Sequence, residues 1–253
     1  MHQLVLYIFF GVLPSLIWLF YYLQKDLHPE PKKMILKVFL WGALATVPTL
    51  FFQIFFSEAL NQFQYLSVFY SPEISAYLPM INNFVRWFIV IALTEEVFKY
   101  LAVRLTVFKS KELDEPLDVM LYMVVAALGF AGLENIFYLF SPIDNMVSLE
   151  TVLKTTITIS FIRFIGATFL HTLCSALLGY FLAISSLKNG HGAKFTLLGI
   201  FLATLLHGLY DFSIMTLEAP FNVIIPILII LGLAVFMVYD FDGIKKVKSI
   251  CKL

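Results

Sequence analysis

Seven stretches of this chain are apolar over about the length that a helix needs to cross a bilayer, and polar loops separate them. A helix rises 1.5 Å per residue, so about 20 apolar residues span the hydrocarbon core. The chain is 60% hydrophobic, whereas soluble domains contain about 45–50% apolar residues. Its charged residues make up only 13%. The sequence therefore predicts an all-α, polytopic membrane helix bundle with about seven transmembrane helices.

The apolar pattern also gives approximate helix boundaries. We expect helices at residues 4–23, 34–56, 81–107, 118–140, 157–187, 193–217 and 221–239. The fifth stretch is too long for one perpendicular span, so it should tilt or begin in the interface. Residues 59–80 are expected to form an aromatic and polar connecting loop, either lying along the outer interface or simply joining two helices. We treat 1–253 as a single integral-membrane domain, with a motif-bearing core at about 81–217.

The distribution of lysines predicts the orientation. Because cytoplasmic loops are rich in basic residues, the N-terminus should lie outside and the C-terminus in the cytoplasm. This predicts a multi-pass protein of the cell (inner) membrane. A net charge of zero gives no indication of a nucleic-acid partner, and the positions of Cys174 and Cys251 predict no disulfide. Lysines are concentrated in alternate loops and the tail: Lys25, Lys32, Lys33, Lys109, Lys111, Lys188, Lys194, Lys245, Lys246, Lys248 and Lys252.

Ionisable residues inside the apolar stretches point to a functional site. A charged side chain at the bilayer centre costs roughly 2.5–3.5 kcal/mol on insertion scales, so adjacent Glu95 and Glu96 need a physical reason. Four expected helices place such groups between the midplane and the outer half, roughly 9–21 Å from the outer ends. A shared polar cavity would explain this coincidence. The candidate residues are Glu95, Glu96, Glu134, His171, His207 and Asp211.

Spacing along the helices suggests partners for these groups. Lys99 follows Glu95 at i,i+4, so we expect these two to face each other. Asp211 follows His207 at the same spacing and can orient the imidazole. Arg163 is interpreted either as a supporting site residue or as an anchor at the outer interface.

Adjacent carboxylates suit acid–base chemistry. In a low dielectric both cannot easily be charged, so one can act as a base towards water and the other as an acid. The histidines could then stabilise an oxyanion or bind a metal. This combination favours hydrolysis of a bond that is brought into the membrane.

Five segments in the right order resemble the motifs of the PrsW family of intramembrane proteases. These are YLQKDLHPEP at 22–31, EEVFK at 95–99, GFAGLENIFY at 129–138, the stretch 163–180, and HGLYDF at 207–212. His28 stands where an acidic residue is more usual. The family is related to the CAAX-processing and bacteriocin-associated membrane proteases.

The resemblance implies a peptidase in which Glu95 or Glu96 activates water, and we expect Glu95 to be the general base. It implies that Glu134, His171 and His207 complete the site, with Asp211 orienting His207. It also implies a single-span membrane protein as substrate, such as a membrane-tethered anti-sigma factor, cut near the extracytoplasmic side. Supporting roles are expected for Lys99, Asn135 and Arg163.

The cofactor is left open by the residues. A divalent metal such as zinc would be held by His171, His207 and Glu134, whereas a metal-free site would use the histidines for an oxyanion. The absence of a compact H-x-x-x-H pair favours no tightly bound metal.

Two other functions fit part of the pattern. A proton- or cation-coupled transporter would also place Glu and His in the membrane, but the chain shows no internal repeat. A non-catalytic scaffold of the same superfamily is the second alternative.

Overall fold

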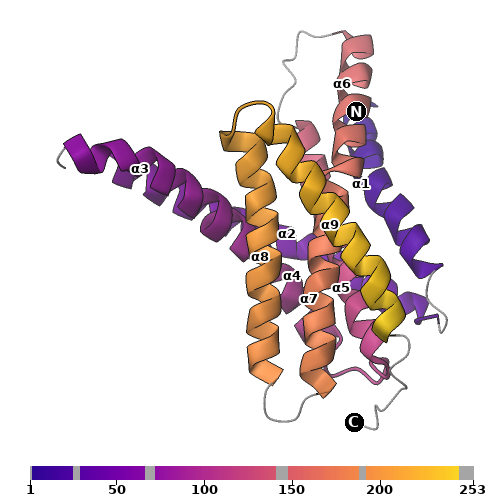
Figure 1. Ribbon diagram of the computed structural model, residues 1–253. Coiled ribbons are helices and arrows are strands. Elements are labelled where there is room, and N and C mark those ends of the chain that lie inside the picture. The colour runs from indigo at the N-terminus through magenta and orange to yellow at the C-terminus, as the bar shows by residue number, and fades with distance from the viewer. Residues whose placement is uncertain (1, 25–28, 66–71, 141–147, 188–191, 245–253) are drawn as a thin grey trace.

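The computed structural model describes residues 2–24, 29–65, 72–140, 148–187 and 192–244, and this part of the chain contains helices and no strand. Seven helical stretches are long and apolar enough to cross a membrane, which confirms the predicted all-α, multi-pass membrane bundle. The orientation of the termini stays a prediction. The helices are α1 (His2–Leu23), α2 (Lys32–Tyr65), α3 (Pro72–Phe84), the π-helix η2 (Val85–Leu93), α4 (Thr94–Thr106), α5 (Pro116–Phe140), α6 (Leu149–Ile165), α7 (Ala167–Leu187), α8 (Gly192–Thr216) and α9 (Phe221–Ile244) (Figure 1).

Helix α5 forms the centre of the bundle and is almost completely buried. It packs against α1, α2 and α7. Small residues bring α2 and α5 into backbone contact: a Cβ on Gly129 would lie 1.9 Å from the carbonyl oxygen of Phe39. Likewise, a Cβ on Gly42 would lie 2.0 Å from the carbonyl oxygen of Ala126. This close approach, typical of membrane helices, holds α2 beside the helix that carries Glu134.

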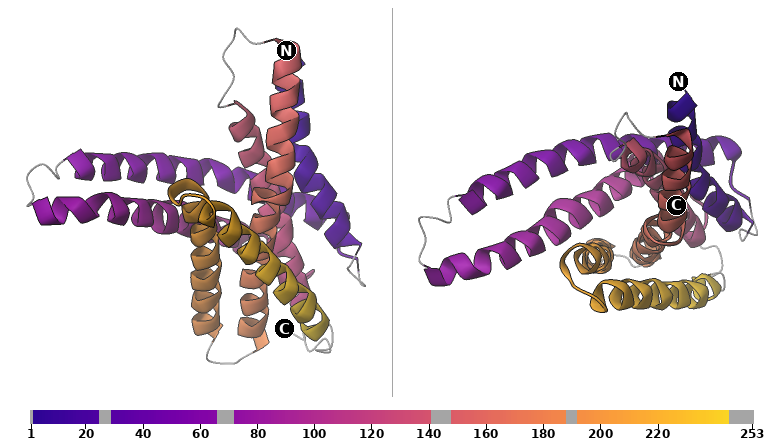
Figure 2. Two further views of the ribbon diagram at one scale, coloured as in Figure 1. Left: turned by 45° about the horizontal axis from the view of Figure 1, so that its top comes forward. Right: turned by 90° about the horizontal axis from the view of Figure 1, so that it is seen from above.

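The far end of α2 and helix α3 project from the bundle as a two-helix arm (Figures 1 and 2). Polar side chains join α2 to α3 and to the adjoining η2: Asn82 of α3 donates to Gln64 (2.7 Å), and Arg86 of η2 donates to Asn61 (2.8 Å). The expected loop at 59–80 is therefore wrong. Residues 59–65 continue α2 and 72–80 belong to α3, while 66–71 lie outside the described residues. Polar residues that suggested a loop instead link the paired helices.

The third predicted span runs without interruption from α3 through η2 into α4. The nine-residue π-helix η2 ends at Leu93, and the hydroxyl of the next residue, Thr94, donates to the carbonyl of Ile91 (2.9 Å). π-helical turns are rare and often lie at functional sites. Gly208 of α8 gives η2 room, since a Cβ there would lie 2.7 Å from the Phe88 ring. Helix α4 thus begins beside α8, directly before the two adjacent glutamates.

The fifth predicted span is two helices, not one tilted helix. Helices α6 and α7 meet at Gly166, where a Cβ would lie 2.6 Å from the Tyr210 hydroxyl. Trp18 of α1 fixes this junction: its ring stacks on Phe169 with centroids 4.3 Å apart, and its N–H donates to the carbonyl of Phe164 (3.1 Å). The break depends on contacts of Gly166 with Tyr210 of α8 and of Phe169 with Trp18 of α1. Hydropathy reports only the local sequence, so it could not reveal this break.

Several sequence-based predictions concern residues outside the described part of the chain. Cys251, His28 and the basic residues of the tail are among them. Cys174 is buried with a free thiol.

Candidate active site

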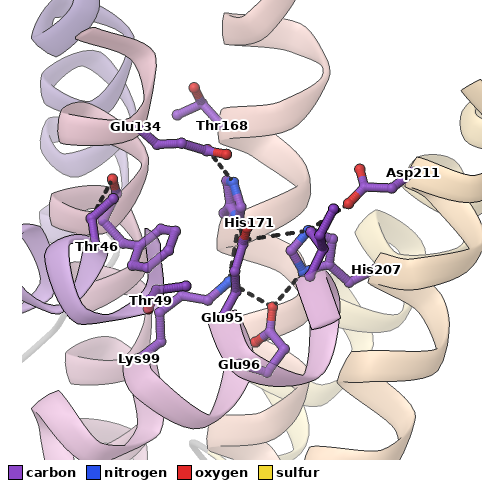
Figure 3. Close-up of polar contacts among 12 residues, drawn as sticks. Thr46, Thr49, Glu95, Glu96, Lys99, Glu134, Thr168, His171, His207 and Asp211 are labelled. Carbon is purple, nitrogen blue, oxygen red and sulfur yellow. Dashed lines mark hydrogen bonds and ion pairs between the residues drawn. The ribbon is translucent and has the colours of Figure 1, made fainter. Parts of the chain in front are cut away.

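The acidic and imidazole side chains singled out in the sequence lie together inside the bundle (Figure 3). They come from four helices that are far apart in the sequence. Most are buried; Asp211 is the most exposed of the group, with 23% of its side chain accessible. The cluster comprises Glu95, Glu96 and Lys99 of α4, Glu134 of α5, His171 of α7, and His207 and Asp211 of α8.

His171 is held from both sides. Its Nε2 lies 2.9 Å from Glu134 Oε2, and its Nδ1 lies 3.1 Å from Lys99 Nζ. Because a protonated lysine can only donate, Nδ1 is the acceptor and Nε2 carries the proton that bonds to Glu134. Lys99 and Glu134 therefore fix the tautomer and the ring orientation of His171.

His207 faces carboxylates at both ring nitrogens. Nδ1 lies 2.8 Å from Glu96 Oε1, and Nε2 lies 3.3 Å from Asp211 Oδ2. The same Nε2 is 3.7 Å from Glu95 Oε2. The ring meets His171 edge to face, with centroids 5.0 Å apart. Carboxylates on both sides suit either a cationic ring or a cation bound beside it.

The i,i+4 spacing had suggested that Lys99 pairs with Glu95. In the structure Lys99 pairs with Glu96 instead. Its Nζ lies 2.6 Å from Glu96 Oε1, and neither side chain is accessible to solvent. Residues three and four apart both neighbour each other on a helix, so spacing alone could not distinguish the two partners. The two glutamates consequently differ: Glu96 is locked in a buried ion pair behind the site.

Glu95, by contrast, faces a cavity. Gln53 of α2 donates to its Oε1 at 2.9 Å. Its Oε2 is buried and has no hydrogen-bond partner among the described residues. That oxygen lies 3.7 Å from a ring nitrogen of each histidine, His171 and His207. Glu96 Oε2 also lacks a hydrogen-bond partner among the described residues, but Glu96 does not line the cavity. Glu95 is thus the one of the two adjacent glutamates that can offer a free oxygen to a water, a substrate or a metal in the cavity.

The cavity has a volume of about 450 Å³ and is lined mostly by apolar side chains of α2, η2, α5, α6, α7 and α8. This is the usual character of a ligand pocket, which combines apolar walls with a few polar groups. At its rim, Ile162 and Met215 are 62% and 63% exposed. The charged or titratable residues lining it are Glu95, Glu134, Tyr138, Arg163, His171, His207, Tyr210 and Asp211.

Arg163 joins this network instead of anchoring the chain at the interface. Its Nη2 donates to Glu134 Oε2 (2.7 Å) and its Nε to Asn135 Oδ1, and its guanidinium stacks on the Tyr138 ring at 3.8 Å. Asn135 in turn donates to Thr168 Oγ1 (3.0 Å). Arg163 and His171 therefore reach the same oxygen of Glu134 from opposite sides of the α6–α7 junction.

Gln53 and Tyr210 are cavity residues that sequence reasoning missed. Gln53 is an amide in an otherwise apolar part of α2, a signal that could have been followed. Tyr210 precedes Asp211 in a recognised motif but gave no separate signal.

Within the cluster, three side chains are arranged to fit a divalent metal. Glu95, His171 and His207 each offer one ligand atom, and these atoms lie within 4.8 Å of one another. Two imidazoles and a carboxylate are the ligands of one class of catalytic zinc site. Glu95 replaces Glu134 in the predicted set, because Glu134 is bonded to Arg163 and to the far nitrogen of His171.

The charges in the cluster agree with that fit. With neutral histidine rings, its four carboxylates and the cations Lys99 and Arg163 leave a net charge of −2. A buried excess of negative charge is costly unless protons or a cation balance it. The donor set and the unpartnered Glu95 oxygen therefore suit a divalent ion. An ion bound at Nδ1 of His171 would have to displace Lys99, which contacts that nitrogen.

Comparisons with known proteins agree with the motifs. The model of the family described as "PrsW family intramembrane metalloprotease" matches residues 30–239. Protease PrsW of Oceanobacillus iheyensis is 28% identical over 221 residues, covering 87% of this chain and 88% of the relative. Protease PrsW of Bacillus subtilis is 24% identical over 223 residues, covering 87% and 88%. No solved structure matches the chain significantly. The matched range contains the whole cluster, and the chain belongs to the PrsW family of intramembrane proteases.

Proposed function

We propose that this peptidase cleaves a membrane-tethered protein inside the bilayer, with Glu95 as the general base that activates water. The observation that carries the proposal is the buried, unpartnered Oε2 of Glu95, which lines the cavity and lies 3.7 Å from both histidines. A general base must be within hydrogen-bond reach of the proton it takes. A water in the cavity beside this oxygen would meet that requirement.

The reaction can be written with the residues at hand. Glu95 accepts a proton from water as the water oxygen attacks the carbonyl carbon of the scissile peptide. The carbonyl oxygen becomes an oxyanion, which His207 stabilises when its ring is cationic between Glu96 and Asp211. When the C–N bond breaks, Glu95 returns the proton to the leaving amine. Water is consumed, and a new carboxyl group and an amine result.

The other residues of the cluster hold Glu95 and His207 in place. Glu96 and Lys99 form the buried pair behind the site, and Lys99 also bonds to His171. Glu134 receives His171 on one side and Arg163 on the other. We therefore assign Glu96 a structural role, holding Lys99 and His207 in position. It does not take a proton from the attacking water in this proposal.

A divalent metal such as zinc would be held by Glu95, His171 and His207, and it would supply a Lewis acid for the water and the peptide carbonyl. In that case Glu95 is a ligand, and the base must be another group. The two versions of the site thus differ in the role of Glu95 and in their response to a chelator.

The proposed substrate is a single-span membrane protein, such as a membrane-tethered anti-sigma factor, cut near the extracytoplasmic side. Apolar cavity walls support a substrate segment that comes from the membrane. The exposed apolar side chains Ile162 and Met215 at the rim support entry from the lipid. The lysine pattern of the loops supports the side of cleavage.

A cleavage assay with purified protein in lipid vesicles tests the proposal, using a panel of labelled single-span membrane proteins. We expect Glu95→Gln to abolish cleavage and Glu58→Gln to leave it unchanged, because Glu58 lies exposed on α2. Equal cleavage by wild type and Glu95→Gln would contradict the assignment. Activity that survives a chelator indicates the glutamate-based site, and activity lost to a chelator and restored by Zn²⁺ indicates the metal site.

A further inference from the structure

One hydrogen bond ties Glu95 to a helix that contributes no member of the charged cluster. Gln53 of α2 donates its amide N–H to Glu95 Oε1 at 2.9 Å. Within the described chain, this is the sole hydrogen bond to the Glu95 side chain. Gln53 is half-buried and lines the same cavity. The residue therefore contacts the proposed base from α2, whereas the two histidines lie on α7 and α8.

We propose that Gln53 is a positioning residue that sets the carboxylate plane of Glu95, an inference that rests on the proposed role of Glu95. The terminal torsion of a glutamate is broad and only weakly restricted by its own side chain. With Oε1 held by Gln53, Oε2 is directed between His171 and His207, 3.7 Å from each. Without that bond, the carboxylate can rotate and either oxygen can turn towards the histidines.

Other polar side chains of α2 do not replace Gln53. Thr46 and Thr49 also line the cavity, but the hydroxyl of Thr46 donates to the carbonyl of Phe130 (3.3 Å). The hydroxyl of Thr49 donates to the carbonyl of Ala45, one turn back on its own helix (2.8 Å). Gln53 is thus the residue through which α2 acts on Glu95.

The packing of α2 on α4 keeps this bond at its length. Phe52, beside Gln53, contacts Phe98 of α4 with ring centroids 5.5 Å apart. Two neighbouring contacts between the same helices, one apolar and one polar, fix the amide against the carboxylate. A neutral amide also supplies the donor without adding a third cation to a site that holds Lys99 and Arg163.

The test measures kcat and KM separately for Gln53→Leu, which keeps much of the volume and removes the donor. We expect kcat to fall by about 10–100-fold, the usual cost of losing a group that orients an active-site ligand, with KM changed by less than about threefold. Gln62→Leu is the matched control on the same helix, because Gln62 bonds to Glu58 on the exposed arm. It should keep the wild-type kcat.

A second variant covers a failure of Gln53→Leu to fold. Gln53→Asn keeps an amide that is one methylene shorter and should lose most of the bond, so its kcat should also fall while its unfolding midpoint stays near that of wild type. A wild-type kcat in a folded Gln53 variant, or a raised KM with unchanged kcat, would overturn the inference. Glu95→Gln in the same assay separates the two proposals: if it is inactive while Gln53→Leu is fully active, only the positioning role fails.

Discussion

Removal of Lys99 should destabilise the protein far more than removal of an exposed lysine. In Lys99→Met the partner Glu96 keeps its charge but loses a cation at 2.6 Å, in a place where neither side chain is accessible. Breaking a buried ion pair on one side typically costs about 3–5 kcal/mol, and Glu96 Oε1 then keeps only its contact with His207 Nδ1 at 2.8 Å. The variant also frees Nδ1 of His171, which Lys99 contacts at 3.1 Å. Cleavage should therefore fall together with stability.

The assay is equilibrium unfolding in detergent micelles, with a matched control and a double variant. Lys154→Met removes an i,i+4 pair with Glu150 in which both side chains are more than three-quarters exposed, and it should cost at most about 0.5 kcal/mol. Lys99→Met combined with Glu96→Gln removes both charges and should recover at least half of the loss. A loss of stability in Lys99→Met no larger than in Lys154→Met, or a double variant as unstable as the single one, would show that the buried Lys99–Glu96 pair does not stabilise the fold as proposed.

Two more predictions concern packing and the arginine network. Gly129→Ala should fold poorly, because its Cβ would lie 1.9 Å from the carbonyl oxygen of Phe39. Gly232→Ala is the control and should be tolerated, since no atom lies within 4 Å of its Cβ. Equal unfolding midpoints of the two variants would contradict the close packing of α2 on α5. Arg163→Lys should lower kcat at least tenfold, because an ammonium cannot reproduce the two directed bonds to Asn135 and to the α5 carboxylate. Arg86→Lys is its control, because Arg86 of η2 bonds to Asn61 and does not line the cavity, and identical kcat values for both would disprove the role.

The bundle itself was predictable because hydropathy directly reports how many helices cross a membrane. All seven spans were found where long apolar stretches predict them. Hydropathy was less informative where polar side chains satisfy one another. Gln64 suggested a loop but accepts a hydrogen bond from Asn82 and so joins α2 to α3. The junction at Gly166 depends on Tyr210 of another helix, a contact that no local pattern encodes.

The composition of the cluster was predictable, but its pairing was not. Buried charges must find partners in a membrane, so the sequence could gather the ionisable residues of four helices. Which side chains pair depends on how each helix is rotated about its axis. Lys99 pairs with Glu96 because Glu95 faces the cavity and Gln53. The preceding π-helix, Val85–Leu93, alters the register of that helix in a way that an ideal helical periodicity cannot represent.

Membership in a protease family decides between the functions that the ionisable residues left open. A transporter and a peptidase both place glutamates and histidines in the membrane. The structure adds a chemical distinction between the adjacent glutamates: Glu96 is neutralised by Lys99, and Glu95 presents an unpartnered oxygen to the cavity.

The role of Glu95 as the catalytic base is tested by measuring kcat of Glu95→Gln beside Glu96→Gln and Glu58→Gln on the same cleaved substrate. We expect Glu95→Gln to lower kcat by at least about 10²–10⁴-fold, the range for loss of a general base. We expect Glu58→Gln to match wild type and Glu96→Gln to keep measurable activity. A Glu95→Gln enzyme that turns over at the wild-type rate, or a Glu96→Gln enzyme that alone is inactive while folded, would contradict the assignment of Glu95 as the base.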